Sequence, residues 1–160
     1  MNTDRDVQRF AADRMLARLA RWLRLCGADV SFDPRRGGAE LLHEARREHR
    51  IVLTRDKRLR TAPDVFYLSS ELFRDQLREV VEKFAIDPRR GALMRCSQCN
   101  SELLEVSREA VRQRVPPFVY ASQERFSVCE GCGRIYWPAT HRARILRELA
   151  RIESGSPISR

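Results

Sequence analysis

Two Cys-x-x-Cys pairs constrain the fold of this 160-residue chain more than any other feature of its sequence. One pair lies in "RCSQCN" and the other in "SVCEGCG", in the pattern Cys-x2-Cys-x29-Cys-x2-Cys. Two residues between cysteines allow a tight turn that directs both thiolates at one ion, and two such turns complete a tetrahedron. The sequence therefore predicts a zinc site with four protein ligands, which are Cys96, Cys99, Cys129 and Cys132.

Protein thiolates fill all four positions of this site, so we interpret the zinc as structural rather than catalytic. Gly131 and Gly133 give the second turn a flexible backbone, and Asn100 follows the first turn. Two disulfides are an alternative, which a reducing compartment disfavours, and an iron–sulfur cluster is another. The fifth cysteine, Cys26, lies on the apolar face of a predicted helix, where we expect a core residue.

Composition favours a soluble nucleic-acid-binding protein. Hydrophobic residues make up 42% of the chain, enough for a core, yet no apolar run approaches the roughly 20 residues that span a bilayer. The first ten residues, "MNTDRDVQRF", contain acids and no apolar signal segment, so we expect a cytoplasmic protein without a membrane partner. The net charge of +9 is carried almost entirely by arginine, whose planar fork matches phosphate. Solvated surfaces of an arginine-rich protein are the alternative explanation.

Short apolar strands alternate with amphipathic helices in the first half of the chain, in the order β-α-β-α-β-β-α. This pattern predicts an α/β fold with a mainly parallel sheet, spanning residues 1–90. The segment "DPRRG" at 87–91 is a plausible boundary, and a small metal-held module with a C-terminal helix follows over 91–150. Residues 151–160 read as a tail. The predicted strands are 7–12, 28–32, 51–54 and 65–68, and the predicted helices are 13–26, 39–50, 69–86 and 140–152.

Acidic residues directly follow the predicted strands. Asp13 follows the first and Asp56 follows the third, while Asp33 ends the second and Glu40 lies near the start of the next helix. Ligands gather at the carboxyl ends of strands in open α/β sheets, and clustered carboxylates there bind Mg²⁺ or Mn²⁺. Such metals hold a phosphate, activate a water and stabilise the leaving oxygen. Helix capping by Asp13 and ordinary turn roles for Asp33 and Asp56 are the alternatives.

Four segments together resemble one family: "FAADRMLARLARWLRLCGADV", "ELLHEARREHRIVLTRDKRL", "RCSQCNSELLEV" and "CEGCGRIYWPATH". The chain is similar to the Mut-seven C-terminal RNase domain family from about Arg9 to about Ile145. The resemblance implies a PIN-like three-layer ribonuclease fold followed by a C-terminal zinc ribbon. It further implies hydrolysis of RNA phosphodiester bonds at a carboxylate-bound Mg²⁺ or Mn²⁺. Relatives often have glycine where this chain has Pro138.

The resemblance carries the family's acids onto Asp13, Glu40 and Asp56 as catalytic residues, with Asp13 and Asp56 as Mg²⁺ or Mn²⁺ ligands. Glu40 matches less securely, because related sequences often carry an aspartate slightly earlier, at the positions of Gly37 and Gly38. Glu44 is a second candidate for this acid. The fourth acid of the family has no clear match, and Asp75 is a candidate.

Basic residues beside these acids would hold the RNA backbone outside the metal site. The residues expected to bind RNA are Arg14, Arg18, Arg21, Arg55, Lys57 and Arg58. An ordinary solvated face is the alternative for the helical arginines. Tyr136 and Trp137 either stack on bases or are buried, and His141 is expected at the surface or in packing, since four cysteines complete the zinc shell.

Three functions remain open from the sequence. The first is a metal-dependent ribonuclease with a structural zinc ribbon. The second is a non-catalytic RNA- or ribosome-binding protein that uses the PIN-like fold as a scaffold, which the incomplete acid set keeps open. The third, ranked last, is a toxin-like nuclease with an inhibitor.

Overall fold

The computed structural model describes residues 8–92 and 94–153 and divides the chain into two compact units. The first unit contains the residues up to Leu23 together with Ala28–Ala85. The second contains Arg24–Gly27 together with the residues from Ile86 onward. Most of the predicted tail lies outside the described residues, which end at Glu153.

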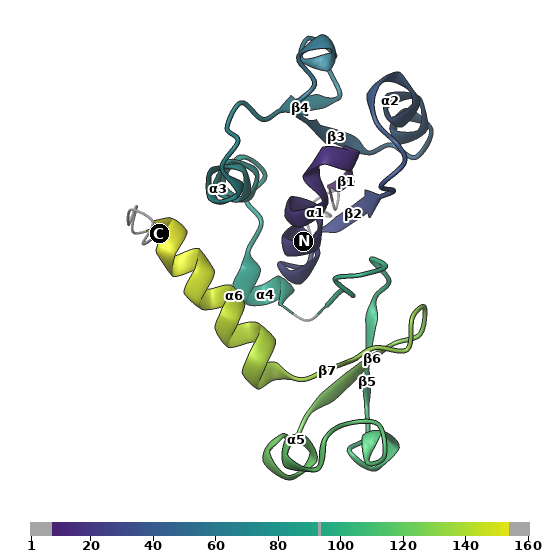
Figure 1. Cartoon of the computed structure of the whole chain (residues 1–160), viewed down its shortest axis with the longest axis vertical. Helices are drawn as coiled ribbons and strands as arrows, with labels where there is room; N and C mark the ends of the chain where they lie inside the picture. The colour runs from purple at the N-terminus through teal and green to yellow at the C-terminus, as the bar shows by residue number, and fades with distance from the viewer. Residues whose placement is uncertain (1–7, 93, 154–160) are drawn as a thin grey trace, which may run out of the picture. The chain divides into compact units, whose positions relative to one another are not determined.

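A four-stranded parallel sheet organises the first unit (Figure 1). Its spatial order is β2-β1-β3-β4, so β1 and β3 are neighbours in the middle although β2 separates them in the chain. This sheet and its helices confirm the predicted α/β class and the predicted order of elements. The strands are β1 (Arg9–Ala12), β2 (Asp29–Phe32), β3 (Ile51–Thr54) and β4 (Val65–Tyr67).

Three α-helices cover this sheet: α1 (Ala17–Leu25), α2 (Gly38–Arg47) and α3 (Phe73–Lys83). The chain passes from β1 to β2 through α1 and returns through α2 to β3, on the other side of β1. Right-handed crossovers in opposite directions place α1 and α2 on opposite faces of a parallel sheet. The unit therefore has three layers.

Alternation along the strands supplies both faces of the core. Ala11 and Val52 point to one face, where they pack against Leu41 and Ala45 of α2. The residues adjacent to these along each strand point to the other face. There the rings of Phe10 and Phe84 meet edge to face, with their centroids 4.9 Å apart. Because both faces are covered, β3 consists of a continuous apolar run, as its sequence predicts.

Three side chains depart from the burial that helical periodicity predicts, which places Met15 and Leu72 on the apolar faces of their helices and Arg24 on a polar face. Met15 is exposed because Arg14–Leu16 form a 3-10 turn before α1 begins. Leu72 is exposed because α3 begins only at Phe73, later than predicted, and Leu72 lies in extended backbone before it. Arg24 was expected on the polar face of its helix but is buried. Its guanidinium donates hydrogen bonds to the backbone oxygens of residues 97 and 98.

The second unit contains a three-stranded antiparallel sheet in the order β5-β6-β7. A core of Val111, Val115, Val119 and Phe126 packs beside it. The sequence predicted the C-terminal helix over 140–152, and it is present. The elements of this unit are α4 (Pro88–Gly91), β5 (Leu103–Val106), α5 (Pro117–Ser122), β6 (Phe126–Cys129), β7 (Ile135–Tyr136) and α6 (Pro138–Glu153).

Within the described ranges, no helix has the length and apolar character needed to cross a membrane.

The sheet core makes a first prediction. Leu53→Ala should lower the free energy of unfolding by about 2–5 kcal/mol, because Leu53 is fully buried in β3 and its loss leaves a cavity. Leu72→Ala is the matched control and should change stability by less than about 0.5 kcal/mol, since Leu72 is 54% exposed. Chemical denaturation of both variants measures the difference. Equal destabilisation would contradict this account of the core.

Candidate functional site

All four strands of the first unit end at the same edge of the sheet, because they are parallel. Asp13 follows β1, Asp33 follows β2, and Arg55 and Asp56 follow β3. The chain leaves the adjacent strands β1 and β3 toward opposite sides, which creates a topological switch point between them. Asp13 and Asp56 thus lie at the edge where open α/β sheets bind their ligands.

A single hydroxyl joins these two predicted acids. The Thr54 Oγ1 donates a hydrogen bond to Asp13 Oδ2 at 2.8 Å and accepts one from the Asp56 backbone N–H at 3.0 Å. Thr54 is fully buried at the end of β3. The backbone N–H of Asp13 donates to the oxygen of Leu53 at 3.0 Å, which holds the two strand ends together. The structure therefore brings Asp13 and Asp56 into one network.

Thr54 was not among the site residues predicted from sequence. The signal that indicates it is the short motif "TRD", in which a polar residue ends an apolar strand two positions before an acid. The motif indicates that a hydroxyl stands at the end of the strand, but only the pairing of β3 with β1 identifies Asp13 as its partner.

The Asp13 carboxylate is buried, with 1% of the residue exposed. Besides the Thr54 hydroxyl it accepts a long hydrogen bond of 3.4 Å from the Met15 backbone N–H, which is a helix-capping contact. Across residues 8–92 and 94–153, Asp13 has no ion pair with a basic side chain. A buried carboxylate without a cation carries a large desolvation cost, so this position favours a bound cation.

Gly37 lies directly against this carboxylate. A Cβ added at Gly37 would come within 3.0 Å of Asp13 Oδ1 and 3.3 Å of Arg14 Nε. The extended backbone of Gly37 suits any residue, so available space, and not conformation, favours glycine here. The family resemblance suggested an acid at the position of Gly37 or Gly38, and this chain has a carboxylate at neither.

Asp56 is held in its ionised form. Both its carboxylate oxygens accept hydrogen bonds from the Arg58 guanidinium, which lowers the pKa of Asp56 below its ordinary value. Asp56 also accepts the Arg58 backbone N–H and thereby caps the 3-10 turn Lys57–Leu59. The capping role considered for Asp13 and the turn role considered for Asp56 therefore both exist, together with their shared network.

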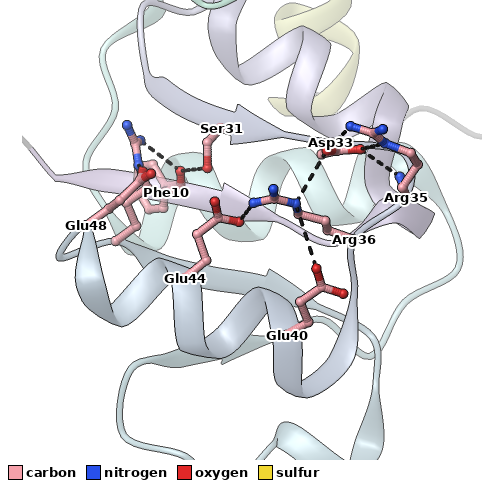
Figure 2. A network of polar contacts seen from close by, with 9 residues as sticks. Phe10, Ser31, Asp33, Arg35, Arg36, Glu40, Glu44 and Glu48 are labelled. Atoms are coloured by element: carbon pink, nitrogen blue, oxygen red, sulfur yellow. Dashed lines mark hydrogen bonds and ion pairs between the residues drawn. The ribbon is translucent and has the colours of Figure 1, made fainter.

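The Arg36 guanidinium is paired with three other carboxylates at this edge (Figure 2). It lies 3.4 Å from Asp33 and 4.0 Å from Glu40, and it also contacts Glu44. Hydrogen bonds from the Arg35 side chain and backbone lower the pKa of Asp33 to about 2. The structure thus pairs Glu40, Glu44 and Asp33 with arginine, and Glu40 keeps a 72% exposed side chain on the first turn of α2.

The predicted RNA-binding residues differ in how they are held. Arg18 stacks on the Phe73 ring at 4.2 Å, and the Arg55 guanidinium donates to Glu71 at 2.9 Å. Arg58 pairs with Asp56, as described above. The other three predicted RNA-binding side chains are exposed, and these are Arg14, Arg21 and Lys57.

The second unit brings all four predicted zinc ligands together. Their sulfur atoms lie within 4.8 Å of one another. Two of the Sγ–Sγ distances are 3.5 Å for Cys96–Cys132 and 3.2 Å for Cys99–Cys129. Zn–S bonds of about 2.3 Å in a tetrahedron require sulfur atoms about 3.8 Å apart. The cluster fits a zinc ribbon and can hold a metal such as zinc.

The two cysteine turns share one backbone design. The N–H groups of Asn100 and Gly133 donate to the oxygens of Cys96 and Cys129, at 3.0 and 2.7 Å. Asn100 and Gly133 both have positive φ, 68° and 73°, which asparagine and glycine tolerate best. The left-handed conformation turns each chain back past its cysteines. Asn100 therefore does in the first turn what Gly133 does in the second.

Tyr136 is buried beside the cysteines and does not present its ring to solvent. Its hydroxyl lies 3.1 Å from Cys96 Sγ and accepts the Ser97 backbone N–H at 3.3 Å. Burial raises the pKa of Tyr136 to about 12, so the hydroxyl keeps its proton. Of the two roles considered for Tyr136, burial is the observed one. Cys26 is also buried as predicted, and burial raises its pKa to about 12.

Comparison with known proteins identifies a family for this chain. The Mut7-C RNAse domain family matches residues 8–149, nearly the whole chain, and the chain belongs to this family. Membership indicates a ribonuclease, with RNA as its substrate. No curated protein and no solved structure matches the chain.

The Thr54 bridge can be tested by stability. Thr54→Val keeps the shape but leaves the Asp13 oxygen and the Asp56 N–H without their partner, so it should cost about 1–3 kcal/mol of unfolding free energy. Thr54→Ser keeps the hydroxyl and should cost about 1 kcal/mol or less. Urea denaturation compares the two. A valine variant as stable as the serine variant would show that the bridge contributes nothing.

The cysteine cluster can be tested by metal content. The wild-type protein should contain about one zinc per chain, and Cys129→Ser should lose it, because three thiolates no longer close the tetrahedron. Cys26→Ala is the matched control: it removes a buried cysteine outside the cluster and should keep the zinc. Elemental analysis after gel filtration gives the stoichiometry. Wild-type protein without zinc would refute the assignment.

Proposed function

We propose that this protein is a PIN-like ribonuclease that hydrolyses RNA phosphodiester bonds with Mg²⁺ or Mn²⁺ bound by Asp13 and Asp56. The observation that carries the proposal is the buried Asp13 carboxylate, which has no ion-pair partner among the described residues and lies at the switch point of the sheet. A hard divalent cation would offset the cost of that burial. The chain belongs to an RNase family, so an RNA phosphate would bind such a cation together with the protein carboxylates.

The residues of this chain would divide the work as follows. Asp13 and Asp56 hold the cation, and Thr54 fixes the Asp13 oxygen through its 2.8 Å hydrogen bond. The cation supplies positive charge for the phosphate oxygens and lowers the pKa of water. Glu40 is the proposed third acid, and it would have to exchange its contact with Arg36 for the site.

Basic side chains around the acids would hold the RNA backbone. The exposed Arg14, Arg21 and Lys57 are available for phosphate contacts, which set affinity and its salt dependence. Arg18, Arg55 and Arg58 already contact Phe73, Glu71 and Asp56. The proposal requires that their remaining N–H donors contact phosphate.

We assign the second unit a structural zinc ion at Cys96, Cys99, Cys129 and Cys132. The predicted division into a nuclease domain, 1–90, and a zinc ribbon module, 91–150, and a cytoplasmic location belong to the same proposal.

A non-catalytic RNA- or ribosome-binding role is the second candidate. The observation that favours it is the pairing of Asp33, Glu40 and Glu44 with arginine, together with glycine at position 37 beside Asp13. With two carboxylates in the network, a cation would bind weakly. The basic surface would still bind RNA.

Cleavage of a labelled RNA separates the two candidates. Metal-stripped protein supplied again with zinc should cleave only after Mg²⁺ or Mn²⁺ is added, and Asp13→Asn and Asp56→Asn should each lose at least about 100-fold in rate, since each removes a cation ligand. Asp64→Asn is the control, because Asp64 pairs with Arg46 at the opposite edge of the sheet. It should cleave like wild type.

A second measurement covers the possibility that the variants fold differently. In the absence of divalent ions, Asp13→Asn should be at least as stable as wild type, because it removes a buried charge. Mn²⁺ should raise the unfolding temperature of wild type and not of Asp13→Asn. Intact RNA binding without cleavage by wild type at any Mn²⁺ concentration would establish the binding role instead.

A further inference from the structure

Phe118 is the most exposed of the large hydrophobic side chains that the structure describes, at 73%. It lies in the second unit, in the short helix α5. An aromatic ring in water carries an unfavourable hydration cost, which a partner that covers the ring would remove. Nothing in the family membership or in the zinc site accounts for this exposure.

The backbone around Phe118 is rigid. Pro116 and Pro117 precede it, and Pro117 is the first residue of α5. Val115 and Val119 on either side are anchored in the core with Val111 and Phe126. The ring is therefore presented on a fixed support, so a partner would have little backbone entropy to remove on binding.

The chain around Phe118 leaves its ring accessible and carries an excess of arginine. Ala121 and Ser122, one helical turn later, are small and exposed. Arg112 and Arg114 precede the prolines and are exposed as well. Within the described part of the chain, no hydrogen bond or ion pair holds the Arg112 side chain. Residues 107–125 contain four arginines and two glutamates.

Arg114 ties this segment to the cysteine site. Its Nη2 donates to the oxygen of Gly133, in the second cysteine turn, at 2.8 Å. A guanidinium has five N–H donors, so this bond leaves others for a phosphate. The position of the arginine is thus fixed by the same turn that would hold the metal.

We propose that the Phe118 surface, formed by Arg112, Arg114, Pro116, Pro117 and Phe118, binds single-stranded RNA. Phe118 stacks on an unpaired base, and the two arginines contact the adjacent phosphates. An exposed ring on a supported backbone, with two exposed arginines close by in the chain, suits single strands, since duplex bases are stacked on one another. The sequence had assigned possible base stacking to Tyr136 and Trp137, and Tyr136 is buried beside the cysteines.

The proposal concerns a site separate from the Asp13 network and rests on the proposed function only for the choice of RNA. Binding is measured without added divalent ions, so that cleavage does not enter the result. The probe is a labelled single-stranded RNA of mixed sequence, and the protein is the full chain in its zinc-loaded form.

Phe118→Ala should weaken binding by roughly tenfold, and Phe118→Leu by a similar factor, because leucine keeps apolar area but offers no ring to stack. Phe118→Tyr should retain wild-type affinity. Arg112→Gln should reduce the slope of log K against log salt by about 0.7, whereas Phe118→Ala should leave the slope unchanged. Met94→Ala is the matched control, since Met94 is 58% exposed in the same unit. It should bind like wild type.

Phe118→Trp gives a direct readout of stacking, because the fluorescence of an indole stacked on a base is quenched. Quenching beyond that of wild type is expected on adding RNA. Wild-type affinity in Phe118→Ala, or full affinity in Phe118→Leu, would overturn the proposal and leave the surface to a protein partner. A wild-type protein that binds RNA through Phe118 but never cleaves it would refute the nuclease and retain this inference.

Discussion

The adjacency of β1 and β3 is the constraint on which the candidate site depends. These strands are separated in sequence by α1, β2 and α2, yet they pair in parallel, with Ala12 opposite Leu53. Their pairing brings the Thr54 hydroxyl to the Asp13 carboxylate. The same Thr54 hydroxyl oxygen accepts a hydrogen bond from the Asp56 backbone N–H. The sheet supplies the rigidity, because its central strands are buried on both faces. The hydroxyl supplies a fixed geometry for the two acids.

In the described part of the chain, the carboxylates at this edge of the sheet are of two kinds, some paired with arginine and one buried without such a pair. Asp33, Glu40 and Glu44 are paired with arginine and share two guanidinium groups, those of Arg35 and Arg36. Asp13 is buried and has no such cation among the described residues. Desolvation makes the second arrangement costly in the absence of a ligand, and stored cost of this kind is typical of functional sites. This contrast, rather than the number of acids, distinguishes Asp13 from the other carboxylates.

Several features could be predicted because they depend on local sequence. The bounds of β3 followed from a short run of three apolar residues that Thr54 ends, and the cysteine turns followed from the two-residue spacing and from Asn100 and Gly133. Other features could not. Leu72 fits the apolar periodicity of α3, but the helix begins one residue later and leaves the Leu72 side chain exposed. Arg24 fits an arginine stripe by spacing, but its guanidinium binds backbone oxygens of the first cysteine turn.

The sequence by itself determined the order of strands and helices, the α/β class, the four metal-ligand positions and the membership in an RNase family. Each of these depends on periodicity or on short spacings, which are properties of neighbouring residues. Tertiary structure alone decided that Thr54 connects the two acids, that Arg36 pairs with Glu40, and that Phe118 is left exposed while Tyr136 is buried. Those outcomes depend on which strands pair and which side chains compete for the same space, and residues far apart in the chain settle both.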